Sequence, residues 1–355
     1  MKNGMKVIDI EHHYYTKLLV EEYVKTKKGA EDKVLTQKAP TTIFLPLVTD
    51  EEAKKNNLKD AFDYKIFIGQ DLGENRLKNM DNAGVDYAHI SLTTPGAEYF
   101  PVEISKKIAA DSNDILSDAV KKHPDRIGGW ITLAPEDPEW SAKELERGKT
   151  LGLYGWSCLS NMNGKYIDDP KYFPILEKLE ELEMPMYIHP NDPPKAENPE
   201  FGYVMYGPTF GFMVDAQYCL LRMIHRGIFD KLPKLKVILG HDGEGLPFFF
   251  NRIDTAYRQG FTAPSGSIKD AHYNHAPSYY IENNMYLTTS GNFLHEALRC
   301  SIDVMPKGRV MMSTDYPYED FKGSVDFIAD NKKLTDDEKK DILANNAMAL
   351  GFGCK

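Results

Sequence analysis

The sequence lacks the features of membrane-spanning and disulfide-rich proteins. Its 355 residues contain no run of about 18 apolar residues, so no segment is expected to cross a bilayer. The first residues lack the apolar core of a signal peptide. The four cysteines, Cys158, Cys219, Cys300 and Cys354, lie far apart and form no CxxC or CxxH spacing. We therefore expect a cytoplasmic protein with reduced thiols.

The sequence also lacks a positive charge balance and a dinucleotide-binding signature. Its 43 lysines and arginines face 53 aspartates and glutamates, which gives a net charge of -10 and disfavours a nucleic-acid-binding surface. No GxGxxG motif follows the first apolar run, which counts against an open Rossmann-like sheet. A small anionic substrate remains compatible with this charge, because a local cationic site can bind an anion inside an acidic protein.

Eight short apolar runs alternate with amphipathic, helix-like stretches. The runs begin at Lys6, Val85, Arg126, Leu153, Pro185, Lys236, Met285 and Arg309. Buried strands that alternate with helices are typical of a parallel sheet covered by helices. Eight of them favour the α/β class and a closed (β/α)8 TIM barrel, formed as one domain by residues 1–355.

Two long segments interrupt this alternation. They cover about residues 29–71, after the first strand, and about residues 191–209, after the fifth. Long loops after barrel strands line the C-terminal mouth, where barrel enzymes place their active sites. We expect both insertions to form walls of a substrate pocket, with a disordered or simply packed insertion as the alternative.

Metal-capable side chains stand at the C-terminal ends of four expected strands. They are Glu11, His13, His189, His241 and Asp315. Glu11 and His13 are two residues apart and should share the face that points into the barrel, which turns His12 towards the helices. A single strand-end histidine is commonly structural. Burying five such groups together costs several kcal/mol unless they are paired or hold a cation, and this mixed set suits Zn²⁺ or Mn²⁺.

The order of these motifs resembles the amidohydrolase superfamily and, within it, the metal-dependent aromatic acid decarboxylases. The resemblance rests on IDxExH at the first strand, YIHP at the fifth, LGHDGEGLP at the sixth and STDYP at the eighth. It extends over nearly the whole chain. The branch includes the γ-resorcylate, 2,3-dihydroxybenzoate and 5-carboxyvanillate decarboxylases, so the resemblance implies a carboxy-lyase that forms a homodimer or homotetramer.

The resemblance also implies residue roles. Glu11, His13, His189 and Asp315 would ligate one divalent ion, Zn²⁺ or Mn²⁺. His241 and Glu244 would form a dyad beside the substrate. Arg252 would bind an anionic substrate group or hold Glu244. Further candidates for contact with the aromatic ring follow motifs near the mouth, with core packing as the alternative for the aromatic ones: Phe210, Phe212, Asn292, Phe293 and Tyr316.

Non-oxidative decarboxylation of a hydroxylated aromatic acid requires a proton on the ring carbon that bears the carboxylate. We expect Asp315 to donate this proton, and His241 with Glu244 to position or deprotonate the phenol. The reaction has no redox step, so no organic cofactor is expected. For Arg76 we expect an ion pair in preference to a place in the pocket.

The alternative function is a mononuclear metal-dependent hydrolase of a lactone or amide. Binuclear hydrolases of the superfamily carry a carbamylated lysine at the end of the fourth strand, whereas LYGWSCLSNMNG has no lysine there. This absence favours a single metal and weakens the hydrolase interpretation. A barrel that has lost catalysis is a third alternative, and the intact set of metal-capable residues argues against it.

Overall fold

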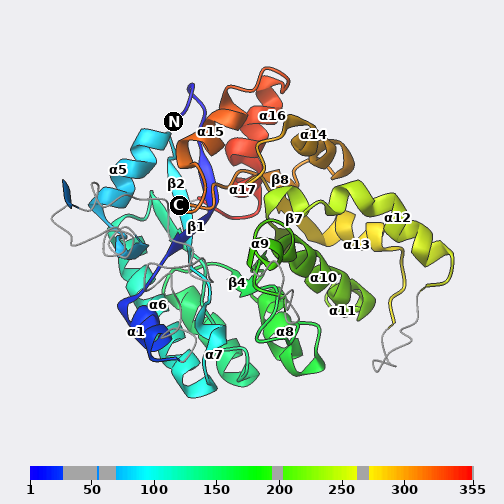
Figure 1. The fold of residues 1–355 in the computed structure, drawn as a ribbon, viewed down its shortest axis with the longest axis horizontal. Helices are drawn as coiled ribbons and strands as arrows, with labels where there is room; N and C mark the ends of the chain where they lie inside the picture. Colours follow the sequence, from blue (N-terminus) through cyan, green and yellow to red (C-terminus); the bar gives the residue numbers. More distant parts are fainter. Residues whose placement is uncertain (27–53, 56–68, 194–202, 262–271, 354–355) are drawn as a thin grey trace.

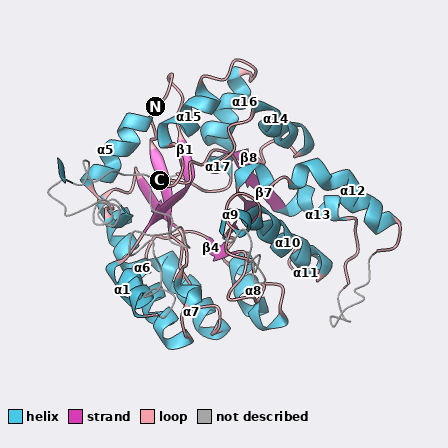
Figure 2. Cartoon of the chain, in the orientation of Figure 1, coloured by secondary structure: helices cyan, strands magenta, loops and turns pink. Residues whose placement is uncertain are grey.

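The computed structural model describes residues 1–26, 54–55, 69–193, 203–261 and 272–353. The first expected insertion, at about residues 29–71, lies almost entirely outside the described residues. The middle of the second one, residues 194–202, lies outside them as well. Figure 2 shows the described chain as helices around a small set of central strands.

The described residues contain eight strands, all paired in parallel. They are β1 (Ile8–Tyr14), β2 (Tyr87–Leu92), β3 (Ile127–Gly129), β4 (Trp156–Leu159), β5 (Met186–His189), β6 (Val237–Leu239), β7 (Met285–Thr288) and β8 (Val310–Met311). The strands pair in the orders β1-β2-β3 and β4-β5-β6-β7-β8. Single bridges join Ile131 to Trp156 and His12 to Tyr316, which close the two seams. The predicted α/β fold, a (β/α)8 barrel, is confirmed.

Helices form a ring outside the strands (Figure 1). They are α1 (Lys17–Lys25), α5 (Glu74–Ala83), α6 (Val102–Lys122), α7 (Pro138–Thr150), α8 (Phe173–Glu181), α9 (Tyr203–Tyr206), α10 (Gly211–His225), α11 (Ile228–Lys231), α12 (Leu246–Arg258), α13 (Pro277–Asn284), α14 (His295–Val304), α15 (Phe321–Ala329), α16 (Asp336–Lys340) and α17 (Asn346–Ala349). Short helical turns are η1 (Ala97–Tyr99), η2 (Pro170–Tyr172), η3 (His241–Gly243) and the π-turn η4 (Asp341–Asn345). None of the described helices is both long and apolar enough to span a membrane.

Apolar side chains fill both faces of the strands, as a parallel barrel requires. The larger core lies between strands and helices, and a smaller one fills the barrel interior with Ile8, Ile10, Tyr187, Ile238 and Met311 among its members. These apolar side chains fill the interior of the barrel below the carboxyl ends of its strands. They leave the carboxyl ends of the strands as the place where polar side chains meet.

A β-bulge in β1 sets the direction of its last side chains. Asp9 pairs with Ala88 and His12 with Ile90, so three steps along β1 match two steps along β2. Without this extra residue, the inward position of Ile10 would place His12 inside the barrel as well. The bulge instead turns Glu11 and His13 inward. His12 faces outward, as predicted, and packs on Tyr316 and on Phe321 of α15.

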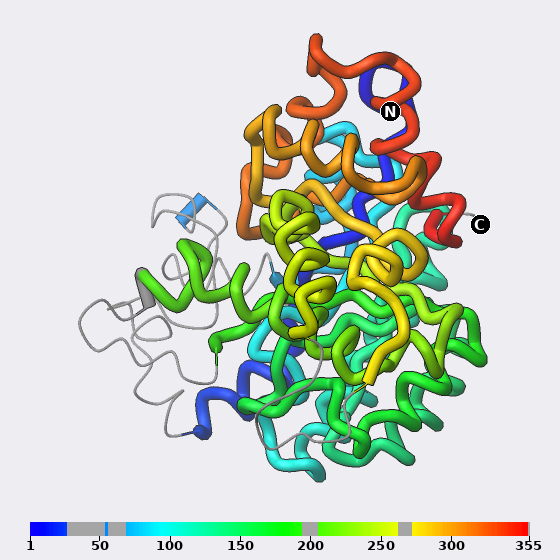
Figure 3. Tube along the Cα trace, turned by 90° about the vertical axis from the view of Figure 1, so that its right-hand side faces the viewer, coloured from blue at the N-terminus to red at the C-terminus, as the bar shows by residue number. Residues whose placement is uncertain are grey.

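The two short helices α1 and α9 mark the mouth of the barrel. Figure 3 shows both projecting from the same end of the molecule, away from the C-terminus of the chain. Each follows a strand whose last side chains are polar, since α1 comes after β1 and α9 after β5. The polar strand ends therefore open towards this face.

Candidate active site

The structure brings Glu11, His13, His189 and Asp315 together at the barrel mouth. One ligand atom from each lies within 4.8 Å of the corresponding atoms of the other three. Glu11 and His13 come from β1, His189 ends β5 and Asp315 follows β8. The sequence therefore identified a set that is separated by about 300 residues in the chain but shares one small volume.

Neighbouring groups hold the distal atoms of three of the four candidate ligands. Ser290 and Ser313 both donate hydrogen bonds to Oε2 of Glu11. His13 Nδ1 pairs with the Ser91 hydroxyl at 2.9 Å. His189 Nδ1 donates to the carbonyl of Pro190 at 2.9 Å, which leaves Nε2 with its lone pair. Such outer contacts fix the orientation of ligand side chains around a metal ion.

Three atoms that face the centre of the cluster are buried without a hydrogen bond. Glu11 Oε1, His13 Nε2 and Asp315 Oδ1 are buried and make no hydrogen bond in the described part of the chain. His13 Nε2 and Asp315 Oδ1 approach to 2.9 Å, yet they do not align as donor and acceptor. Buried polar atoms without partners are costly, and a divalent cation bound by all of them removes this cost. The donor set thus fits a Zn²⁺ or Mn²⁺ ion.

Burial and neighbouring charges perturb the pKa values of the cluster. Burial raises the pKa of Glu11, and the negative charge of Asp315 adds to that effect. Burial lowers the pKa of His189 to about 3, with help from His13, so this imidazole is neutral and able to bind a metal. Burial alone would raise the pKa of Asp315, but His13 and His241 outweigh it and hold that pKa well below its usual value.

His241 and Glu244 form a dyad at the edge of the cluster. His241 Nδ1 and Glu244 Oε1 are 2.6 Å apart, and Nε2 of the same ring points to Asp315 Oδ2 at 4.0 Å. Burial lowers the pKa of His241, but the carboxylates of Glu244, Glu11 and Asp315 outweigh burial and raise it well above the ordinary value. A carboxylate on one ring nitrogen leaves the other nitrogen free to act towards the centre of the site.

Strained backbone is concentrated at these positions. His241, Asp242, Glu244 and Asp315 have φ values of +50°, +55°, +55° and +55°, in the left-handed region that residues with a Cβ rarely occupy. Such positions persist only where the surroundings hold them, and they cluster at functional sites. Here the strained backbone directs the side chains of His241, Glu244 and Asp315 towards the same barrel mouth.

Several other residues singled out by the sequence lie elsewhere. Arg252 is exposed on α12, in an outer groove with Phe249 and Tyr257, and not beside the metal cluster of this chain. Tyr316 is 8% exposed and stacks on His12, which places it on the outer side of β1. The structure therefore does not bring these two candidates into the cluster.

The remaining ring-contact candidates are partly or largely exposed near the mouth. Phe210 is 51% exposed and Phe293 is 39% exposed, while Phe212 and Asn292 are half-buried. Their exposure is compatible with contact to a bound ring. For these four residues, a role in substrate binding stays a prediction.

Arg76 is buried but makes no ion pair in the described part of the chain. Its guanidinium donates to the carbonyls of His13 at 2.8 Å and Asp71 at 2.6 Å, and lies 5.1 Å from the ring centre of Tyr316. The expected ion pair does not form among the described residues. Arg76 instead anchors the end of β1, where the backbone of His13 needs a hydrogen-bond donor.

Sequence reasoning missed the residues that support the ligands. Ser91, Ser290 and Ser313 contact Glu11 or His13 but carry no pattern of their own. The signal was present only indirectly, since Ser290 lies in TTSGNF and Ser313 in STDYP, next to recognised positions. A serine at the end of a strand is too common to be identified as functional without the geometry.

The sequence model of the amidohydrolase family matches residues 8–350. This chain belongs to the amidohydrolase family. Among its curated relatives, gamma-resorcylate decarboxylase from Polaromonas sp. is 34% identical over 290 residues, which cover 79% of this chain and 87% of the relative. Gamma-resorcylate decarboxylase from Rhodococcus jostii is 32% identical over 293 residues, again 79% of this chain and 87% of the relative. The resemblance identified in the motifs is confirmed.

Solved structures of amidohydrolase-type decarboxylases superpose on nearly the whole chain. The 5-carboxyvanillate decarboxylase from Novosphingobium aromaticivorans, complexed with manganese and 4-hydroxy-3-methoxy-5-nitrobenzoic acid, gives a TM-score of 0.84 at 31% identity and covers 98% of this chain and 96% of that chain. The dihydroxybenzoic acid decarboxylase from Polaromonas sp., with manganese and the inhibitor 2-nitroresorcinol, gives 0.79 at 28% identity and covers 98% and 96%.

Neighbouring histidines of β1 provide a test of the ligand set in this amidohydrolase. His13→Gln removes a nitrogen that faces the cluster, and Mn²⁺ affinity should fall by about a hundredfold. The matched variant His12→Gln alters a ring that faces Asp9 and Tyr316, and Mn²⁺ affinity should change by less than about threefold. Calorimetric titration of both folded variants with Mn²⁺ measures the difference. Equal losses would contradict the inward placement of His13.

Asp242 should make the stability of this amidohydrolase depend on pH. Burial raises the pKa of Asp242 to about 8, and neither carboxylate oxygen has a partner among the described residues. The pKa of Asp242 is higher in the folded protein than in the unfolded chain, where it is about 3.9. Asp242 therefore contributes its full stabilisation below about pH 3.9, and this contribution is lost as pH rises through about 8. Asp242→Asn keeps a residue that tolerates positive φ and cannot ionise.

The Asp242→Asn variant should therefore unfold at a temperature at least about 3 °C above that of the unmodified protein at pH 9, with a smaller gain at pH 6. Thermal unfolding at the two pH values measures the effect. The exposed Asp125→Asn serves as the control and should show no such pH-dependent gain. A gain of equal size at both pH values would show that Asp242 is already ionised in the folded protein at about pH 6, and would contradict its raised pKa.

Proposed function

We propose that this amidohydrolase catalyses the metal-dependent, non-oxidative decarboxylation of a hydroxylated aromatic carboxylic acid to a phenol and CO₂. The observation that carries the proposal is the mononuclear set of Glu11, His13, His189 and Asp315 with the His241–Glu244 dyad directed at Asp315. The named activities of the curated relatives support the same reaction class.

Mn²⁺ is the ion we propose for the cluster, with Zn²⁺ as the alternative. Two carboxylates and two imidazoles offer a mixed oxygen and nitrogen set that suits either ion. The manganese in the structures of both decarboxylases described above favours the first. When bound, the ion would supply a positive charge for the substrate carboxylate and an adjacent phenol oxygen. No organic cofactor is required, because the reaction transfers no electrons between molecules.

Asp315 is the proposed proton donor to the ring. Decarboxylation breaks the bond between the ring carbon and the carboxylate, and the same carbon must gain one proton. Asp315 lies at the centre of the cluster, 13% exposed, with His241 Nε2 at 4.0 Å from its Oδ2. His13 and His241 keep Asp315 ionised before the reaction, so Asp315 first takes the proton held by charged His241 and then passes this proton to the ring carbon. Glu244 stabilises the charged ring of His241. Burial excludes competing water from this transfer.

We also propose that the protein is a cytoplasmic homodimer or homotetramer. Apolar side chains lie exposed along α10 and α12, where Phe210, Val214 and Tyr218 are 43–51% exposed and Phe248 is 79% exposed. Large apolar side chains that are exposed in a single chain are often covered in an oligomer. A second copy of the chain would cover them. The free thiols of Cys158, Cys219 and Cys300 fit a reducing compartment.

A substrate screen tests the proposed reaction. The protein is loaded with Mn²⁺ or Zn²⁺ and incubated with monohydroxybenzoates, dihydroxybenzoates, vanillate-type acids and a few lactones, while absorbance and released CO₂ are recorded. We expect one equivalent of CO₂ for each phenol formed. Opening of a lactone without CO₂ would overturn the proposal in favour of a hydrolase.

Asp315→Asn tests the role of the proton donor. The amide keeps the size and one ligating oxygen of Asp315 but cannot deliver the proton, so kcat should fall by at least about a thousandfold. Circular dichroism and the Mn²⁺ content should show that the fold and at least part of the metal site persist. A variant that retains more than about one tenth of kcat would remove Asp315 from the proton transfer.

A further inference from the structure

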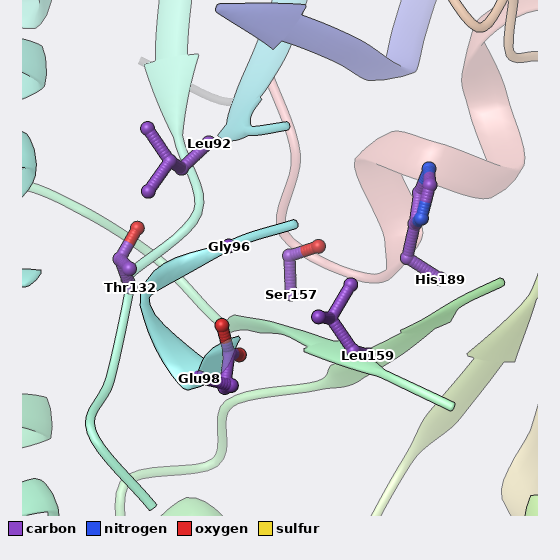
Figure 4. A pocket seen from close by; sticks show the side chains of 7 residues that line it. All are labelled: Leu92, Gly96, Glu98, Thr132, Ser157, Leu159 and His189. Carbon is purple, nitrogen blue, oxygen red and sulfur yellow. The ribbon is translucent and has the colours of Figure 1, made fainter. Parts of the chain in front are cut away.

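A small cavity lies beside His189, on the side of the barrel mouth formed by β2, β3 and β4. It is lined by Glu98, Thr132, Ser157 and His189, with Leu92 and Leu159 as its apolar walls. Figure 4 shows these side chains around one opening, with Thr132 and His189 on opposite sides. The cavity therefore borders the candidate metal site, and a substituent of a ring bound at that site would enter it.

Glu98 is the unusual member of this cavity. It belongs to η1, directly after β2, and is 5% exposed. Gly96, with a φ of +67°, precedes it, and a side chain at Gly96 would collide with the carboxyl of Glu98. The local backbone thus leaves a space that the carboxyl fills. No lysine or arginine pairs with Glu98 in the described part of the chain.

The chemistry of Glu98 suits a neutral polar partner. Burial raises the pKa of Glu98 to about 8, although the backbone N–H groups of Ala97 and Glu98 oppose this rise. At neutral pH the carboxyl therefore keeps its proton, so it can donate one hydrogen bond and accept others. The hydroxyls of Ser157 and Thr132 have the same dual capacity.

The size of the cavity restricts what it can hold. About 10 Å³ is open to the centre of a water-sized group, which is close to the space that one water molecule needs. A hydroxyl fits this space, whereas a methoxy group or a second carboxylate is larger. The apolar walls of Leu92 and Leu159 leave the Glu98 side as the polar part of the cavity.

We propose that Glu98 is a specificity-determining residue that, together with Ser157 and Thr132, binds a second hydroxyl group on the aromatic ring. The substrate is then a dihydroxylated acid, in which one hydroxyl neighbours the carboxylate at the metal cluster and the other enters the Glu98 cavity. This assignment rests on the proposed function, since it takes the ring to be bound at that cluster. A site built to bind a hydroxyl discriminates against an analogue without it.

Binding of nitro analogues tests the assignment without turnover, because a nitro group cannot leave as CO₂. The Mn²⁺-loaded protein is titrated calorimetrically with 2-nitrophenol and with its four relatives that carry one more hydroxyl: 3-nitrocatechol, 4-nitroresorcinol, 2-nitrohydroquinone and 2-nitroresorcinol. We expect one of these four to bind about tenfold more tightly than 2-nitrophenol. Glu98→Leu should abolish that preference and leave the affinity for 2-nitrophenol unchanged.

Two further variants complete the test. Glu98→Gln should keep most of the preference, because its amide also donates and accepts hydrogen bonds. Ser157→Ala should reduce the preference by removing one hydroxyl, and it keeps the assignment testable if Glu98→Leu does not fold. Unfolding temperature and Mn²⁺ affinity are measured on every variant as controls.

The outcomes separate this assignment from the proposed function. Equal affinity for all five compounds in the unmodified protein, or a loss in Glu98→Leu that is equal for all five, would overturn the role of Glu98 alone. Absence of binding by every compound would overturn both. A preference that depends on Glu98, in a protein that releases no CO₂ in the substrate screen, would support the hydroxyl site and reject the decarboxylase.

Discussion

The burial of two carboxylates, Glu11 and Asp315, at the centre of one barrel is the constraint on which the rest of the site depends. Like charges in a poorly solvated place repel each other and call for a cation. The backbone that closes the barrel also carries these groups, since Asp315 donates its N–H to the carbonyl of Glu11 at 3.0 Å and His13 donates to that of Tyr316 at 2.7 Å. Barrel closure and assembly of the metal cluster are therefore the same structural event.

Parallel barrel strands are buried on both faces, so all eight were predictable from short apolar runs, and His189 and Asp315 stood out as polar groups at their ends. It was harder to predict which side chains of β1 point into the barrel. Alternation correctly paired Glu11 with His13, but only the bulge explains why they, and not His12, follow Ile10 into the barrel. A one-residue bulge has no dependable sequence signal.

Positions outside the strands were harder to predict, because a motif gives proximity in the chain and not the direction of a side chain. Tyr316 adjoins Asp315, yet its ring lies behind β1 on His12. Arg252 lies in the motif after HDGEG, but the helix α12 turns it towards an outer groove. Glu98 carried no motif at all. Its interest arises only from burial and from the space that Gly96 leaves, which are properties of the folded chain.

The residues proposed for proton transfer and those proposed for recognition of the ring lie on different sides of the barrel mouth. A hydrolase needs a nucleophilic oxygen beside its metal, whereas decarboxylation needs a proton donor beside the ring carbon. The fourth strand contributes Ser157 to a cavity wall and has no charged side chain between Trp156 and Leu159, and the dyad of His241 and Glu244 is directed at Asp315. In the proposed reaction, proton transfer would depend on β1, β6 and β8, while recognition of the second hydroxyl would depend on β4 and on the segments that follow β2 and β3. On this proposal, substitutions on that second side would change the preferred substrate and leave the proposed metal ligands in place.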